Sequence, residues 1–184
     1  MLAATLVALT LGTQAQVIES YQVREGVSLH APVLADSINT EGRRYDEARG
    51  LLGTAINLNQ DNFDTQVMNA DTAGFVTLAK AEGEHLVYVV STRVRADRFM
   101  RGRLKVTSPV RWEAFVNGGM TMKKDNAEDS LNMKSARFIP VRMEPERNYE
   151  ITIKLFAHKE DKAAPTFKCE MMADKGYEGA NVFT

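Results

Sequence analysis

The side chains that could support metal, acid–base or nucleophilic chemistry are few and scattered along this chain. The three histidines, His30, His85 and His158, do not recur at the spacing of a zinc-binding motif. Glu113 and Glu150 lie on neighbouring predicted strands, but a glycosidase pair must face one cleft at a set separation. Their positions are more typical of the polar face of a sheet. No nucleophile elbow, phosphate-binding loop or dinucleotide fingerprint is present, so the sequence indicates no catalytic residues, no cofactor and no metal site.

The single cysteine, Cys169, lies in a predicted strand over residues 166–172. It cannot form an internal disulfide, and a catalytic cysteine would need a histidine and a helix N-terminus beside it. We therefore expect Cys169 to behave as a small buried hydrophobic residue. Without disulfides the fold must be held together by its core, which 184 residues are enough to supply.

The strongest structural signal is the alternation of apolar and polar residues over 111–157. Alternation of this kind buries one face of a strand and exposes the other. Asn117-Gly118 favours a hairpin turn, because both positions require a positive φ. About eight strands are predicted, with short and even turns: 16–23, 75–79, 85–96, 103–107, 110–116, 139–143, 149–157 and 166–172. The fold class is therefore all-β, an antiparallel β-sandwich or jelly roll, with one short helix over 43–52 in an early loop.

The alternation also predicts which side chains face inward. Ile153→Asp should prevent folding, because it would bury an unpaired charge. Lys154→Asp, on the opposite face, should cost no more than about 0.5 kcal/mol. Trp112 is expected in the core between the sheets, with stacking on a ligand as the alternative. The strand over 85–96 is apolar on both faces in its first half, which predicts a central position in its sheet.

Composition and the N-terminus indicate an exported protein that does not bind nucleic acid. The 23 basic residues against 24 acidic ones give a net charge of -1, without the cationic surplus that phosphate binding needs. The arginines over 93–103 are expected to form one solvated face. Residues 1–11 are apolar and too short to span a bilayer, which takes about 20 residues, and Ala15 could be a cleavage position. We predict a signal peptide over 1–15, a single β-sandwich domain over 16–184, no membrane span, and a periplasmic or extracellular location.

Several segments, taken in order, resemble a known module. After the export signal come residues 35–52, the WEAFVNG hairpin over 112–118, and FIPVRMEPERNYEITIKL over 138–155. Together they are similar to the extra N-terminal β-sandwich of exported prolyl-oligopeptidase-family serine peptidases of Bacteroidetes-type bacteria. The resemblance covers most of the chain but rests on sandwich patterns. It implies a non-catalytic accessory module that braces or gates a downstream propeller and hydrolase by intramolecular contact, in a gene fragment ending at Thr184. No position matches the family's catalytic residues.

The same hairpin and residues 141–151 also resemble carbohydrate-binding sandwiches of the galactose-binding-like and protective-antigen-like types. Such modules bind sugars through exposed aromatic rings and convergent polar groups. This resemblance implies a glycan partner and possible ligand or interface contacts by aromatic residues: Tyr45, Phe63, Trp112, Phe115 and Tyr177. An exported structural domain with neither role is the remaining alternative.

Overall fold

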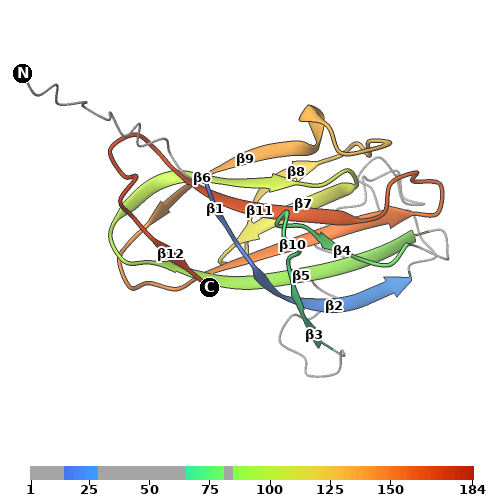
Figure 1. The fold of residues 1–184 in the computed structure, drawn as a ribbon. Coiled ribbons are helices and arrows are strands. Elements are labelled where there is room, and N and C mark those ends of the chain that lie inside the picture. The colour runs from blue at the N-terminus through green and yellow to red at the C-terminus, as the bar shows by residue number, and fades with distance from the viewer. Residues whose placement is uncertain (1–14, 29–64, 81–84) are drawn as a thin grey trace, which may run out of the picture.

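Two antiparallel β-sheets packed face to face make up the described part of the chain (Figure 1). The structure is a computed structural model, which describes residues 15–28, 65–80 and 85–184. The small sheet has the order β1-β11-β6-β9, with β4 also paired to β11, and the large sheet has the order β3-β2-β5-β10-β7-β8, with β12 paired to β5. The small sheet consists of β1 (Gln16–Val17), β4 (Val76–Thr77), β6 (Met100–Thr107), β9 (Ala136–Met143) and β11 (Thr166–Ala173). The large sheet consists of β2 (Ser20–Ser28), β3 (Thr65–Asn69), β5 (His85–Ala96), β7 (Arg111–Val116), β8 (Gly119–Lys124), β10 (Tyr149–His158) and β12 (Val182–Phe183).

The predicted all-β sandwich is confirmed, and so is its central hairpin. From β5 onward the chain changes sheet at every connection except the one between β7 and β8. At that hairpin Asn117 and Gly118 have φ values of 50° and 79°, the left-handed conformation that this pair of residues adopts readily. Strand β5 pairs with both β2 and β10, which confirms its central position.

The core lies between the sheets and is built from the alternate residues that the sequence predicts. On β10, Ile153 and Leu155 are 1% and 0% exposed, and on β7 Trp112 is 1% exposed. They belong to one buried cluster with Leu104 and Ile139 of the small sheet. The inward facing of Ile153 and the core position of Trp112 are therefore confirmed.

The opposite face of β10 differs from the prediction, because part of it is buried. Lys154 is fully buried, with its Nζ 3.9 Å from Oε2 of Glu113 and 5.1 Å from the centroid of the Phe115 ring. On the same face of the neighbouring strand β5, Val87 and Val89 are also buried. The expectation that Lys154 is exposed is therefore wrong, and the tolerance predicted for Lys154→Asp no longer follows from it. Alternation identifies which residues share a face, but it does not tell whether solvent reaches that face.

The structure contradicts the expected arginine face, adds a strand that was not predicted, and leaves two predicted segments undescribed. The arginines over 93–103 do not form one face, because Arg93 and Arg95 lie on β5 of the large sheet whereas Arg101 and Arg103 lie on β6 of the small sheet. Strand β3, which pairs with β2, is not among the predicted strands and lies between those predicted over 16–23 and 75–79. The predicted helix over 43–52 and residues 1–14 of the predicted signal peptide lie outside the described residues. Within the described ranges, no helix is long and apolar enough to cross a membrane.

Candidate functional site

The structure does not bring the predicted aromatic candidates together. Trp112 is enclosed in the core, and Phe115 is 3% exposed on the outer face of β7. Tyr177 is half-buried in the segment that follows β11. Tyr45 and Phe63 lie outside the described residues. Ligand contact through these rings stays a prediction, and for Trp112 and Phe115 it would require a ring to leave its buried position.

The two glutamates of the possible carboxylate pair take part in different ion pairs. Glu113 lies beside the buried Lys154, whereas Glu150 lies beside Arg93. Cys169 is fully buried and belongs to the core cluster, as expected. In the described parts of the chain, no group of three or more His, Cys, Asp or Glu side chains is placed to hold a metal ion.

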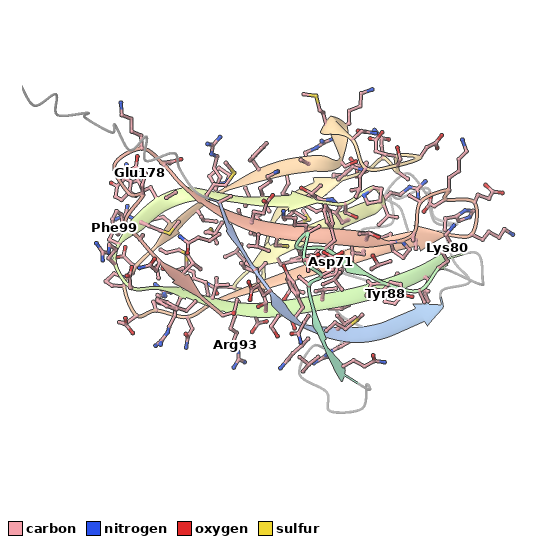
Figure 2. All side chains as sticks on the ribbon, viewed as in Figure 1. Asp71, Lys80, Tyr88, Arg93, Phe99 and Glu178 are labelled. Carbon is pink, nitrogen blue, oxygen red and sulfur yellow. The ribbon has the colours of Figure 1, made fainter. Side chains whose placement is uncertain are left out.

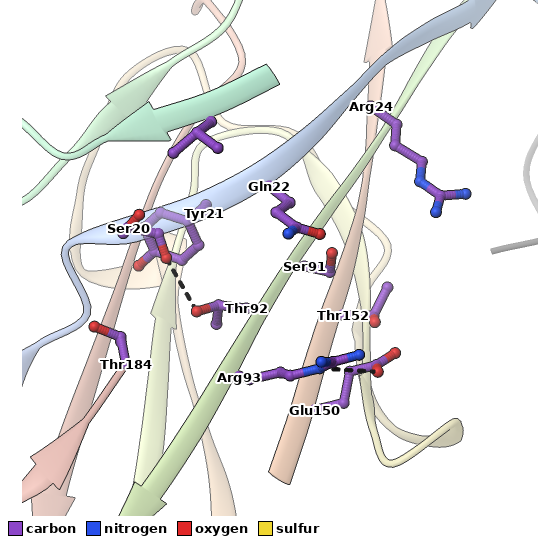
Figure 3. Close-up of a pocket in the computed structure, with 11 residues that line it drawn as sticks. Ser20, Tyr21, Gln22, Arg24, Ser91, Thr92, Arg93, Glu150, Thr152 and Thr184 are labelled. Carbon is purple, nitrogen blue, oxygen red and sulfur yellow. Dashed lines mark hydrogen bonds and ion pairs between the residues drawn. The ribbon is translucent and has the colours of Figure 1, made fainter. Parts of the chain in front are cut away.

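A polar groove crosses the outer face of the large sheet over β2, β5 and β10 (Figure 3). Its volume of about 410 Å³ is in the range of small-molecule binding sites. Its lining includes these polar or charged side chains: Gln22, Arg24, Ser91, Arg93, Glu150 and Thr152. The sequence interpretation did not single out this surface.

The strand register explains why these side chains converge. Gln22 on β2 lies opposite Ser91 on β5, and Ser91 lies opposite Thr152 on β10. In the adjacent row on the same face, Arg93 lies opposite Glu150. Neighbouring strands are about 4.8 Å apart, so the first row places one amide and two hydroxyl groups within about 10 Å of each other. The amide of Gln22, the hydroxyl groups and the charged pair thus all stand on regular strands rather than on loops.

The outer face of β5 changes from apolar to polar at Ser91. Val87 and Val89 are buried on this face, Ser91 is half-buried, and Arg93 is exposed. Figure 2 shows the Arg93 side chain extending away from the sandwich. This transition, read together with Glu150 and Thr152 on the next strand, is the sequence signal that could have located the groove. Locating the groove from this transition also requires knowing which residues of β10 lie opposite β5, and the sequence of a single strand does not contain that register.

The charged groups of the groove remain accessible. Nε of Arg93 is 4.0 Å from Oε2 of Glu150, and the two side chains are 79% and 44% exposed. An ion pair this open is weak, and either group can exchange its partner for a ligand. Beneath the groove, the Thr92 hydroxyl donates a hydrogen bond of 3.0 Å to the Ser20 carbonyl and so joins β5 to β2 (Figure 3).

The groove presents both hydrogen-bond donors and hydrogen-bond acceptors. Hydroxyl and amide groups both donate and accept hydrogen bonds, guanidinium groups donate, and a carboxylate accepts. The described lining residues include no histidine or cysteine, so a Ser–His or Cys–His pair is not found among them. The groove is suited to a ligand that carries many hydrogen-bonding groups.

No protein-family model and no curated protein matches this chain. Among solved structures, it is similar to a β-glucosidase from Kluyveromyces marxianus in complex with glucose, at a TM-score of 0.48 and 9% identity over 85% of this chain and 15% of that one. It is also similar to a GH31 α-xylosidase from Xanthomonas citri, at 0.46 and 6% over 92% of this chain and 17% of that one. The PA14 sugar-binding domain of an RTX adhesin is similar at 0.44 and 9%, over 92% of this chain and 96% of that one.

The chain thus corresponds to 15% and 17% of the two glycosidases. At identities of 6–9% and TM-scores below 0.5, these similarities assign neither a family nor an activity to the chain. The resemblance to the peptidase module likewise stays a prediction.

Proposed function

We propose that this chain is a carbohydrate-binding module of an exported protein and that the groove over β2, β5 and β10 holds the glycan. The observation that supports this most directly is the row formed by Gln22, Ser91 and Thr152 across three paired strands. Adjacent hydroxyl groups of a sugar present the complementary pattern of donors and acceptors. The apolar run at the N-terminus supports the exported location.

The scaffold also supports the proposal, because the paired strands hold the polar side chains in position before a ligand binds. Residues on paired strands lose less conformational freedom on binding than residues on loops, which lowers the entropic cost of association. Apart from Tyr21 and Val67, the described lining side chains are polar or charged, so we expect hydrogen bonds to supply most of the affinity. We therefore expect a modest dissociation constant, on the order of 0.1–1 mM for an oligosaccharide.

A glycan panel followed by calorimetry tests the proposal. The full chain should bind at least one oligosaccharide, and Gln22→Ala and Ser91→Ala should each raise Kd about fivefold, the effect of losing a hydrogen bond of about 1 kcal/mol. Ser130→Ala, which removes an exposed hydroxyl outside the groove, is the matched control and should leave Kd unchanged.

Thermal melts of the same variants separate loss of binding from loss of folding, since changes at accessible polar side chains usually alter stability by less than about 0.5 kcal/mol. The proposal fails if no member of a broad panel binds. It also fails if both groove variants bind as tightly as the unchanged chain.

A further inference from the structure

The exposed apolar side chains of this protein gather along one edge of the sandwich. In the described ranges, six large hydrophobic side chains are exposed. Four of them lie on β8, on β9 or in the connection between these strands: Met120, Leu131, Met133 and Phe138. Strands β8 and β9 are the last strands of the large and the small sheet. Apolar residues that collect on one part of a surface indicate a contact site for another molecule.

Met133 is the most exposed of these side chains, at 96%, and hydrogen bonds fix the loop that carries it. It begins the 3₁₀ helix η2 (Met133–Ser135), which stands clear of both sheets at the top of Figure 1. Ser135 is fully buried; its hydroxyl accepts a hydrogen bond of 3.0 Å from the Asn132 N–H, and its carbonyl accepts one of 3.0 Å from the Ser108 N–H. Because the loop already holds Met133 outward, burying this side chain against a partner has a small entropic cost.

An apolar recess of about 250 Å³ lies between β8 and β9 on the same edge. Its buried walls come from both sheets and are formed by residues of the core: Val94, Ile151, Met143 and Met171. The exposed side chains at its mouth are Thr121 of β8 and Pro140 and Arg142 of β9. A dry apolar cavity of about 150 Å³ accommodates a benzene molecule, so this recess has room for the side chain of one methionine.

Met133 does not reach the recess of its own chain. It lies before the start of β9 at Ala136, whereas the recess lies beside the second half of that strand, from Pro140 onward. At about 3.4 Å per residue, Ala136 and Pro140 are roughly 14 Å apart, which exceeds the length of a methionine side chain. An occupant therefore has to come from another molecule, and every copy of this chain carries both the methionine and the recess.

We infer that the β8–β9 edge is a self-association surface, in which Met133 of each copy docks in the recess of a second copy. A two-fold axis that is perpendicular to the strands and runs from one sheet to the other reverses the direction of the edge, so both methionines reach a recess at once. The same axis keeps the two large sheets on one side of the dimer. The groove lies over β2, β5 and β10, and β7 separates it from β8, so both grooves stay open and face the same way.

The residues at the mouth of the recess favour contact through side chains over pairing of strands. Pro140 has no backbone N–H, and a proline in an edge strand interrupts the row of donors that a new strand would need. Nε of Arg142 is 3.6 Å from Oε1 of Glu144, so a docked apolar side chain does not leave this guanidinium without a counter-charge. Methionine and arginine are also enriched in protein interfaces relative to the rest of the surface.

The size of the edge indicates how strong the dimer is. The 8 residues of β9 extend for roughly 27 Å. The sheets are about 10 Å apart, and the side chains on their outer faces roughly double that width. About 500 Å² of each copy is then covered, compared with the roughly 800 Å² of a standard stable complex. We therefore expect a weak dimer that forms at protein concentrations on the order of 100 µM.

Sedimentation equilibrium of the full chain, from about 5 µM to about 500 µM, measures this association. The chain should pass from monomer to dimer over this range. Met133→Asp should raise the dissociation constant of the dimer about tenfold or more, because a carboxylate would have to enter an apolar recess. Val67→Asp is the matched control and should leave this constant unchanged, because Val67 is an exposed apolar residue on β3, at the opposite edge of the large sheet.

Cysteine cross-linking tests the arrangement of the two copies. Met133→Cys and Thr121→Cys are made in separate chains, and the native Cys169 does not compete because it is buried. Oxidation of an equal mixture should give several times more disulfide-linked dimer than oxidation of either variant alone. The reason is that the two-fold axis places position 133 of one copy beside position 121 of the other and keeps like positions apart.

The possible outcomes bear on separate parts of the inference. A chain that stays monomeric over the whole concentration range overturns the self-association. A dimer that Met133→Asp does not weaken overturns the role of Met133, and equal cross-linking of like and unlike positions overturns the two-fold arrangement. Calorimetry with a glycan measures the groove independently, so this inference and the proposed function can fail separately.

Discussion

Lys154→Asp should destabilise the protein severely, although the position is on the outward face of its sheet. The Lys154 side chain is fully buried, and its Nζ lies 3.9 Å from Oε2 of Glu113, whose side chain is 15% exposed. Opposite unit charges about 4 Å apart attract each other by about 4 kcal/mol at an effective dielectric constant of about 20. An aspartate turns this attraction into repulsion inside a buried layer. The native pair pays a desolvation cost and the variant can relax locally, and both effects offset part of the change from attraction to repulsion. We therefore expect a net loss of about 3–5 kcal/mol in the free energy of unfolding.

Urea unfolding followed by fluorescence or circular dichroism measures this loss. Lys175→Asp, at an exposed turn, is the matched control and should change the free energy of unfolding by less than about 0.5 kcal/mol. Lys154→Met and Glu113→Gln, made singly and together, isolate the pair, and we expect a coupling energy of about 1 kcal/mol or more. If Lys154→Asp unfolds at the same urea concentration as the unchanged protein, the burial of Lys154 is refuted.

In the small sheet, Gly102→Ala should lower the free energy of unfolding by about 3 kcal/mol, because the added Cβ would lie 2.2 Å from the carbonyl oxygen of Met172. Gly179→Ala, where the nearest atom is 3.5 Å away, is its control in urea melts. Burial raises the pKa of Glu170, but hydrogen bonds from two lysines outweigh it and hold the pKa below the ordinary value of 4.5. The stabilisation from Glu170 is therefore present above about pH 4.5 and lost as pH falls through the folded-state pKa, and unfolding measured from pH 7 to pH 3 should show less acid loss for Glu170→Gln. An equally steep acid loss in that variant would contradict the assignment. Burial raises the pKa of Cys169 to about 12, so a thiol reagent near pH 8 should modify it only after unfolding. Modification of the native protein at the rate of an exposed thiol would refute its burial.

The strands could be predicted because their signals are local. The alternation along β10 identifies Ile153 as a core residue, and Asn117-Gly118 identifies the hairpin from the backbone conformations that these residues tolerate. The apolar first half of β5 also indicates its central position, because a strand that is apolar on both faces usually lies in the interior of its sheet.

The groove and the burial of the outer face around Lys154 could not be predicted, because no single strand contains the necessary information. Gln22, Ser91 and Thr152 are far apart in the sequence, and only the pairing of their strands brings them into one row. The burial of Lys154 depends on what covers its face of the sheet, which alternation within β10 does not specify. Arg93 and Arg101 are close in the sequence but separate in space, because the chain changes sheet between β5 and β6.

The location of the bound glycan is the most direct test of the proposed site. Nuclear magnetic resonance spectra of the isotope-labelled protein, recorded during titration with the tightest-binding oligosaccharide, report which backbone amides sense the ligand. We predict that the largest saturable shifts occur at Gln22, Ser91 and Thr152, with little change at Arg101 and Phe138 on the other sheet. Saturable shifts that cluster away from β2, β5 and β10, or spectra that do not change with any glycan, would contradict the assignment of the groove as the binding site.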